Sequence, residues 1–277
     1  MVIECPFKLY LGILGNIRVK YVLYWRGYKM SGTVSGKRFQ KHSFCGLILA
    51  MEIFQLNKSV LHVRNNAVEF LNGLTTNAMD KPWNAFVDIH GMLISVFDQI
   101  VLNEEEVMMV LDKTAAEAVL SHLDRYAKLS GVKIEKKEDL NVCFDLEGNV
   151  PLEPQDFSIP QKKGRLIITK RKLTANVSGE KFTLFRLRNN IPQQDIDFKR
   201  EEFLLNISEH DHVSYTKGCF LGQEPISKVH NRSKPSWKLV VKAQDECSNE
   251  EKAKMTSKIA DPATRRTTGF VFVSNKD

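Results

Sequence analysis

From Met51 onward, short apolar runs with strand character alternate with amphipathic helical segments, whereas the first fifty residues show no such regular pattern. This change constrains the fold more than any other feature of the chain, because it predicts that the folded region begins near Met51. We expect a main domain over residues 51–232 and a small C-terminal β-barrel over residues 233–277. Residues 1–50 are interpreted as a basic extension outside the fold, and a mitochondrial targeting segment is the alternative.

The net positive charge of the chain comes from that extension. The formal net charge is +7, and residues 1–50 hold eight Lys or Arg but a single acid, Glu4. Residues 51–277 hold 32 basic and 32 acidic side chains, so the predicted fold is electrically balanced. The high isoelectric point therefore does not indicate a nucleic-acid groove in the folded part.

The cysteines and the hydropathy pattern indicate a compartment. The cysteines are odd in number, widely spaced and without a C-x-x-C pair: Cys5, Cys45, Cys143, Cys219 and Cys247. This spacing fits neither a disulfide framework nor a zinc site, and it favours a reducing compartment. Every apolar run is too short for a transmembrane helix. We expect a cytoplasmic protein with no membrane partner, or a protein of the mitochondrial matrix if residues 1–50 target it there.

The expected elements form an α+β layer, with helices over an antiparallel sheet. His90-Gly91 is typical of a hairpin turn, and Thr114 with Glu117 predicts a capping box for a helix that ends at Gly131. Asn65 or Asn66 is expected to cap an earlier short helix, and residues 150–160 to form a loop. The predicted strands are 54–63, 86–89, 92–102, 107–111, 132–135, 141–146, 165–169, 181–188, 237–243 and 269–273.

The segment 214–224 carries the strongest chemical signal. On an extended chain Lys217 and Cys219 share one face, where the ammonium favours the thiolate. A thiolate can attack an electrophile or ligate a soft metal. The alternative is that Cys219 is a small buried hydrophobe. The residues expected to set the geometry of this loop are Gly218, Gly222, Gln223 and Glu224.

This segment resembles the YgfZ family, because Lys217 to Glu224 matches K-G-C-[YF]-x-G-Q-E at every fixed position. The resemblance runs from about Met51 to the C-terminus and includes Leu71–Asn77 near the start. It implies the folate-binding fold of the aminomethyltransferase of the glycine cleavage system (GcvT), which has a central opening of folate size.

The chain departs from these relatives at two places. The transferase carries carboxylates where this chain has Ser95 and Val96, and Asp98 lies a few residues further on. Without a placed carboxylate, proton transfer to or from the cofactor has no agent, so aminomethyl transfer is not expected. Family members often carry an acid where this chain has Arg188, which cannot accept hydrogen bonds from pterin amino groups.

The resemblance implies an accessory factor for the maturation or repair of iron-sulfur enzymes, including those that modify transfer RNA. Cys219 would be the working thiol, and Lys217 would tune it. Tetrahydrofolate or a related folate is the implied small-molecule partner, and iron-sulfur apoproteins or cluster carriers are the macromolecular ones, with transfer RNA involved only indirectly. A transient iron-sulfur cluster on Cys219 is also considered. The candidate folate-contacting residues are Thr76, Asn77, Asp88 and Arg186.

Two other functions stay open, and so does the question of whether the chain is an enzyme. One is a folate-dependent one-carbon transferase in which Asp88 or Asp98 replaces the missing acid. The other is plain folate or RNA binding, for which the basic ribbon 162–172 would meet phosphates or a polyglutamyl tail, unless it is simply a solvated strand pair. His210 and His212 are weak candidates for metal ligands.

Overall fold

The computed structural model describes residues 10–14, 18–25, 28–35, 51–208 and 210–275. The chain divides into two compact units, Met1–Ala50 and Met51–Asp277. In the first unit an antiparallel sheet joins three strands that its irregular sequence pattern does not predict, namely β1 (Tyr10–Leu14), β2 (Arg18–Trp25) and β3 (Tyr28–Ser35). Whether this unit is an extension or a targeting segment stays a prediction. Cys5 and Cys45 lie outside the described residues.

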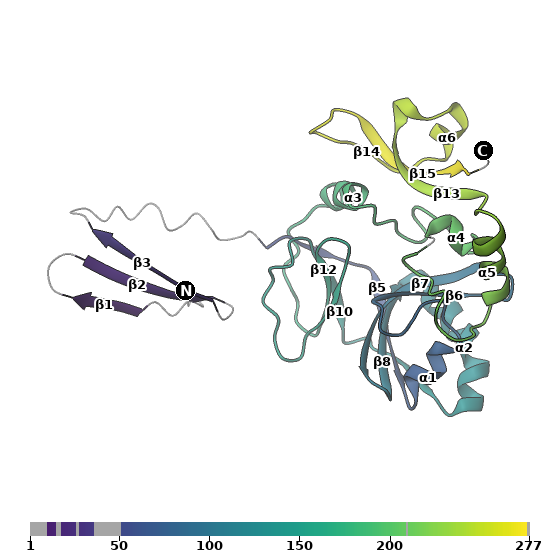
Figure 1. Cartoon of the computed structure of the whole chain (residues 1–277), viewed down its shortest axis with the longest axis horizontal. Coiled ribbons are helices and arrows are strands. Elements are labelled where there is room, and N and C mark those ends of the chain that lie inside the picture. The colour runs from purple at the N-terminus through teal and green to yellow at the C-terminus, as the bar shows by residue number, and fades with distance from the viewer. Residues whose placement is uncertain (1–9, 15–17, 26–27, 36–50, 209, 276–277) are drawn as a thin grey trace. The chain divides into compact units, whose positions relative to one another are not determined.

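The larger sheet of the second unit is antiparallel, with the order β6-β7-β8-β5-β9 (Figure 1). Its strands are β5 (Lys58–Arg64), β6 (Trp83–Val87), β7 (Leu93–Asn103), β8 (Glu106–Asp112) and β9 (Lys133–Lys136). The β6–β7 hairpin turns at His90-Gly91, as predicted, and Gly91 has a φ of 77°. That left-handed conformation is the reason why the turn needs glycine.

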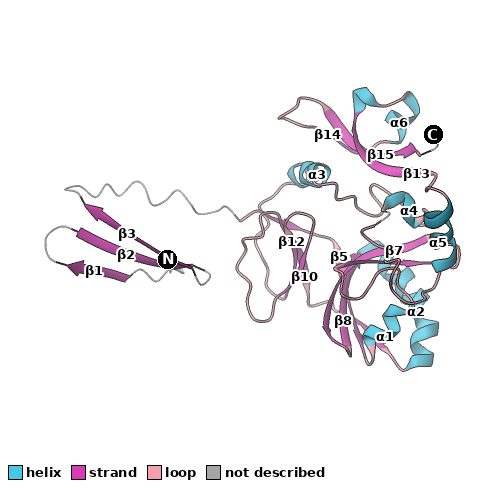
Figure 2. Ribbon diagram, in the orientation of Figure 1, coloured by secondary structure: helices cyan, strands magenta, loops and turns pink. Residues whose placement is uncertain are grey.

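Helices cover one face of this sheet (Figure 2). They are α1 (Ala67–Asn72), the short 3-10 turn η1 (Lys113–Ala115) and α2 (Ala116–Ser130). Val119, Leu123 and Ala127 of α2 recur at helical spacing and are buried against the strands, as the sequence predicts. The helix ends at Gly131, whose φ of 70° confirms the predicted glycine stop.

The smaller sheet is also antiparallel, with the order β11-β12-β10-β4. Its strands are β4 (Ile53–Gln55), β10 (Asn141–Asp145), β11 (Phe157–Pro160) and β12 (Arg165–Thr169). Helix α3 (Gly179–Arg188) packs on it through Phe182, whose ring stacks on Phe54 with centroids 4.1 Å apart. Phe144 completes this aromatic contact, so α3 is fixed beside the sheet.

The C-terminal residues form an open three-stranded sheet of order β13-β15-β14, where the sequence predicts a small β-barrel. Its elements are β13 (Trp237–Ala243), η2 (Gln244–Glu246), α6 (Asn249–Lys254), β14 (Thr256–Ala260) and β15 (Thr267–Ser274). Two more helices precede this sheet, α4 (Leu204–Ile207) and α5 (Gln223–Arg232). Leu239 and Phe270 belong to the same apolar cluster as Leu187 and Leu204, whereas Cys247, Met255 and Val271 form a small cluster of their own. The boundary expected after residue 232 stays a prediction.

Two predicted strands are wrong. The run 54–63 is divided after Gln55, because β4 and β5 pair in different sheets. Residues 181–188 belong to helix α3, since the alternation in F-T-L-F-R-L fits either period and the local cap decides between them. The Ser178 hydroxyl accepts a hydrogen bond from the Lys181 N–H at 3.2 Å, which closes the first turn of a helix.

The predicted caps of two other helices are also wrong. The Thr114 hydroxyl donates to Asp195 at 2.5 Å and caps nothing. Asn66 precedes α1 in the left-handed conformation and makes no side-chain cap. The predicted loop 150–160 contains strand β11 in its last residues. Among the described residues, none of the helices combines the length and the apolar character needed to cross a bilayer.

Candidate functional site

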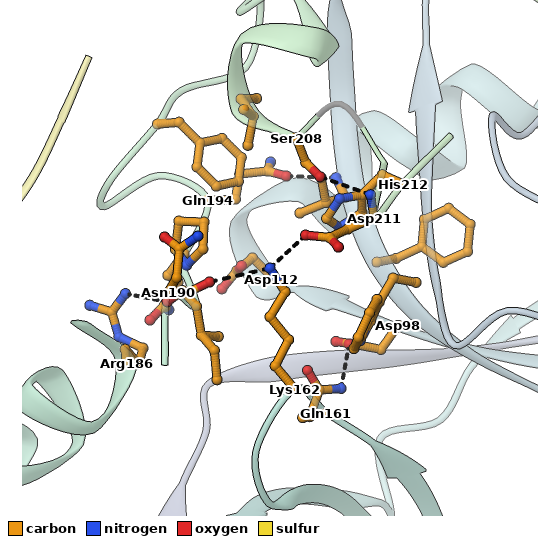
Figure 3. A pocket seen from close by; sticks show the side chains of 18 of the residues that line it. Asp98, Asp112, Gln161, Lys162, Arg186, Asn190, Gln194, Ser208, Asp211 and His212 are labelled. Atoms are coloured by element: carbon orange, nitrogen blue, oxygen red, sulfur yellow. Dashed lines mark hydrogen bonds and ion pairs between the residues drawn. The ribbon is translucent and has the colours of Figure 1, made fainter. Parts of the chain in front are cut away.

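A cavity that opens to solvent lies where the two sheets of the second unit meet α3 and the segments that follow it (Figure 3). Much of its apolar wall is aromatic and is formed by Trp83, Phe97, Phe144, Phe182 and Phe198. Its polar groups include Lys58, Asp98, Asp112, Gln161, Lys162, Gln194, Asp211 and His212. This combination suits a planar, partly polar ligand of small-molecule size.

Two carboxylates and one ammonium group form the first polar cluster of the cavity. Lys58 Nζ lies 3.5 Å from Asp98 Oδ2 and 4.0 Å from Asp112 Oδ2. Gln161 Nε2 donates to Asp98 Oδ1 at 2.8 Å. Burial raises the pKa of Asp98 and of Asp112 above their ordinary values, against the opposing effect of Lys58. These carboxyl groups can therefore accept or hold a proton more readily than surface acids.

The second polar cluster lies on the segment before the K-G-C motif. Lys162 Nζ and Asp211 Oδ2 form an ion pair at 2.6 Å. The Nδ1 atom of His212 is buried and has no hydrogen-bond partner among the described residues. Burial lowers the pKa of His212 to about 4, despite the adjacent Asp211, so its imidazole is neutral at pH 7. A neutral ring with an unpaired nitrogen is available to a ligand.

Gln194 adds a third polar group and has an unusual hydrogen-bond state. Its Oε1 atom accepts from the Val96 N–H at 2.9 Å. Its Nε2 atom is buried and has no partner among the described residues, and the whole residue is only 1% exposed. Buried polar groups are nearly always hydrogen-bonded, so this amide fits a site that a ligand completes.

The K-G-C motif lies outside the lining of this cavity. Of the three cysteines in the described residues, Cys219 alone is exposed, whereas Cys143 and Cys247 are buried. The alternative reading of Cys219 as a buried hydrophobe is therefore wrong. Burial raises the pKa of Cys143 to about 11, which makes that thiol a poor nucleophile.

Lys217 has partners other than those the sequence pattern suggests. Its Nζ atom donates to the backbone carbonyl of Thr75 at 2.7 Å and to that of Asn77 at 2.9 Å. It also lies 5.3 Å from the centroid of the Phe220 ring. Burial lowers the pKa of Lys217 to about 8. The first role of this ammonium is thus to hold the 75–77 turn, and its tuning of Cys219 stays a prediction.

Of the four residues expected to shape the motif loop, some are required by the backbone geometry and others are not. Gly222 has a φ of 80°, and a Cβ atom there would lie 2.3 Å from the carbonyl oxygen of Asp88. Gly218 is exposed and has no atom within 4 Å of its would-be Cβ, so sterics do not demand glycine there. Gln223 begins α5, and its Oε1 accepts from the Phe220 N–H at 3.4 Å. Glu224 is exposed in the first turn of α5.

Of the four predicted folate-contacting residues, only Arg186 lines the cavity. Its guanidinium is already engaged, because it pairs with Asp197 at 2.5 Å. Thr76 and Asn77 are buried and hold the neighbouring backbone instead: Thr76 Oγ1 donates to the His212 carbonyl at 2.5 Å, and Asn77 Nδ2 to the Asp211 carbonyl at 3.0 Å. Direct contact of these residues with folate stays a prediction.

The two aspartates considered as substitutes for the missing acid are separated by the fold. Asp98 lines the cavity, whereas Asp88 is absent from its lining. Asp88 Oδ1 accepts from the N–H groups of His90 and Met92 at 2.8 and 2.9 Å and thereby closes the β6–β7 turn. Val96 lines the cavity where the transferase would carry a carboxylate.

The sequence reading missed Lys58, Asp112 and Gln194 as cavity residues. Lys58 begins β5 and Asp112 ends β8, so each bounds a strongly apolar run, and that position is the signal that was available. Gln194 lies in an irregular segment and offers no such signal.

The metal and nucleic-acid readings find little support. Within the described part of the chain, no group of three or more His, Cys, Asp or Glu side chains could hold a metal ion. Most cations of the basic ribbon 162–172 are paired with acids. The pairs are Lys162–Asp211, Arg165–Asp145, Lys170–Asp139 and Arg171–Glu153. Such pairing leaves little free positive charge for phosphates.

Comparison with known proteins identifies the fold. No protein-family model matches the sequence, and the search of curated proteins finds no match. Among solved structures, the chain is similar to the glycine cleavage system aminomethyltransferase T from Bartonella henselae, with a TM-score of 0.63 and 15% identity. The match covers 80% of this chain and 78% of the transferase. The chain therefore has a GcvT-like fold, as the resemblance of its sequence implies.

Proposed function

We propose that this chain is a folate-binding accessory protein that supports the maturation or repair of iron-sulfur enzymes, with Cys219 as its working thiol. One observation carries the proposal: the cysteine of the K-G-C motif is exposed and lies outside the lining of the cavity. A thiol at the surface can reach a macromolecular partner, while the cavity holds a small molecule. The iron-sulfur clients come from the resemblance to the YgfZ family.

A reduced folate fits the cavity by the chemistry of its lining. The aromatic walls suit a fused planar ring, and Asp98 offers an acceptor for its N–H groups. The unpaired donor of Gln194 and the unpaired nitrogen of His212 are groups that a polar heterocycle would satisfy. When bound, folate would supply one-carbon or redox chemistry, and the residues named here would bind and orient it.

Arg188 does not obstruct this site. The acid that family members carry at this position is missing, but the Arg188 guanidinium pairs with Asp261 at 2.7 Å and is absent from the cavity lining. The loss of that acid is therefore compatible with folate binding, provided that Asp98 accepts the ring donors instead.

A second function, one-carbon transfer to or from folate, is favoured by one observation. Asp98 lies in the cavity wall, and burial raises its pKa, which suits a group that moves a proton. If this function is correct, transfer from a methylamine donor to tetrahydrofolate persists in Cys219→Ser and is lost in Asp98→Asn. We expect no such transfer by the wild-type protein.

The test of the first proposal is complementation of cells that lack the protein. The readout is the activity of an iron-sulfur enzyme after expression of the wild-type chain, of Cys219→Ser or of the control Cys247→Ser. Cys247 is buried, and its Sγ lies 3.3 Å from the Ala243 carbonyl, so serine can keep that contact. We expect full rescue by the control and less than a tenth of wild-type activity with Cys219→Ser. Full rescue by Cys219→Ser would remove the thiol from the mechanism.

A further inference from the structure

The orientation of the Gln194 amide is fixed by its surroundings. The turn that carries it is tight: Asp195 has a φ of 63°, and its N–H donates to the Phe198 carbonyl at 2.7 Å. The Val96 N–H needs an acceptor and finds it in Gln194 Oε1 at 2.9 Å. The amide therefore cannot be reversed without facing two donors toward each other. Its Nε2 atom is the one left unpaired, at a residue that lines the cavity.

Asp98 places an acceptor in the same cavity as this donor. Val96 and Asp98 both line the cavity, and residues two apart on a strand lie about 6.6 Å from each other along it. The Asp98 carboxyl already accepts from Gln161 and lies near Lys58, yet a carboxylate has about four acceptor positions, so it retains capacity for a ligand. The cavity thus presents an unpaired N–H₂ group and a carboxylate in the same lining.

We propose that Gln194 and Asp98 together read the oxo-pyrimidine edge of the ligand, which makes Gln194 the residue that selects a 4-oxo ring. Gln194 Nε2 donates to the ring oxygen, while Asp98 accepts from the neighbouring ring N–H and amino group. This inference rests on the proposed folate function and adds to it the group that distinguishes an oxygen from an amino substituent. A 4-amino ring would direct a donor at the Gln194 donor, and that arrangement is repulsive.

The test uses folic acid and its 4-amino-4-deoxy analogue, in which the 4-oxo oxygen is replaced by an amino group and the neighbouring ring nitrogen has no hydrogen, with tetrahydrofolate as the reference. Calorimetry on the wild-type protein is expected to show at least tenfold tighter binding of folic acid than of the analogue. Gln194→Glu keeps an acceptor for the Val96 N–H and replaces the free donor by a second acceptor. We expect it to reduce the preference for folic acid at least tenfold.

The control is Asn190→Asp, which adds the same negative charge to the cavity lining at a residue not bonded to Val96. It should leave the preference for folic acid within threefold of the wild-type value. If Gln194→Glu does not fold, Gln194→Met decides the matter: it removes the donor and should reduce the preference for folic acid at least threefold, while the contact of Asp98 with the ring N–H keeps the rest of it.

The outcomes separate this inference from the function on which it rests. Failure of the wild-type protein to bind tetrahydrofolate or either analogue would overturn the folate function and the inference with it. Tight binding of tetrahydrofolate, with an unchanged 4-oxo preference in Gln194→Glu or Gln194→Met, would overturn the role of Gln194 alone.

Discussion

The cavity and the motif loop differ in how the chain builds them. The loop comes from one continuous stretch, residues 214–224, and its chemical group, Cys219, is exposed. The cavity is assembled from both sheets of the second unit, from α3 and from the segments that follow it, and most of its polar side chains are buried or partly buried. A surface group thus depends on local geometry, whereas a buried polar site depends on the placement of distant elements.

The two regions are nevertheless joined by a short chain of hydrogen bonds. Lys217 of the loop holds the carbonyls of Thr75 and Asn77. The side chains of Thr76 and Asn77 in turn hold the backbone of His212 and Asp211, which line the cavity. The loop is therefore separate from the cavity in its chemistry but connected to it in its structure.

Gly222→Ala should have the largest effect on the loop. A methyl group there would lie 2.3 Å from the Asp88 carbonyl oxygen, on a backbone with a φ of 80°. We expect a loss of about 3–4 kcal/mol in the free energy of unfolding, measured with urea. Gly218→Ala is the matched control and should change stability by less than about 0.5 kcal/mol. Equal losses of unfolding free energy in Gly222→Ala and Gly218→Ala would contradict the view that the close contact at Gly222 sets the shape of the loop.

Lys217→Met tests the connection between the regions. The substitution leaves two backbone carbonyls without their donor, so the unfolding free energy should fall by about 2 kcal/mol. The exposed Lys163 serves as the control, and Lys163→Met should have little effect. Folate affinity should also fall several-fold in Lys217→Met, because the Asp211–His212 wall loses its support. An unchanged stability together with an unchanged affinity would show that the regions are independent.

His212 gives the cavity a pH dependence of stability at acid pH, below its ordinary pKa of 6.5. Its pKa in the folded protein is about 4, below the ordinary value of 6.5, mainly because of burial. Between these values the unfolded chain binds a proton that the folded protein does not, so stability falls as the pH drops from 6.5 to 4. We expect the contribution of His212 to reach about 2 kcal/mol by pH 5, seen as the part of the pH slope that His212→Gln removes.

The exposed His210 provides the comparison for that experiment. His210→Gln should leave the pH slope of stability as it is in the wild-type protein. A slope that is the same in the wild-type protein and in His212→Gln would show that His212 is solvated in the folded state.

Local signals predicted much of the fold. The His90-Gly91 turn, the buried face of α2 and its end at Gly131 each follow from a few neighbouring residues. Helix α3 was read as a strand, because its alternating apolar residues fit both periods and the Ser178 cap outweighs the pattern. The division between β4 and β5 depends on pairing with distant strands, which no local pattern reports.

The site shows the same difference between features that neighbouring residues determine and features that distant residues determine. The residues of segment 214–224 are contiguous, so the sequence alone identified Cys219 as the chemical group of this loop. It did not identify the hydrogen-bond partners of Lys217, which lie 140 or more positions away in the chain. Of the cavity residues, the sequence pointed to Asp98, Arg186 and His212. It missed Lys58, Asp112 and Gln194, because these come from segments that only the whole fold brings to one cavity. The sequence gives the chemistry of each side chain, whereas the neighbours of that side chain depend on the whole fold.

The most direct test of this account is the affinity of tetrahydrofolate for Cys219→Ser and Asp98→Asn, measured by calorimetry against the wild-type protein. If the cavity alone holds the folate, Cys219→Ser binds it within twofold of the wild-type affinity, and Asp98→Asn binds it at least tenfold more weakly. A tenfold loss in Cys219→Ser, with normal binding in Asp98→Asn, would place the ligand at the thiol and contradict the separation of the two regions.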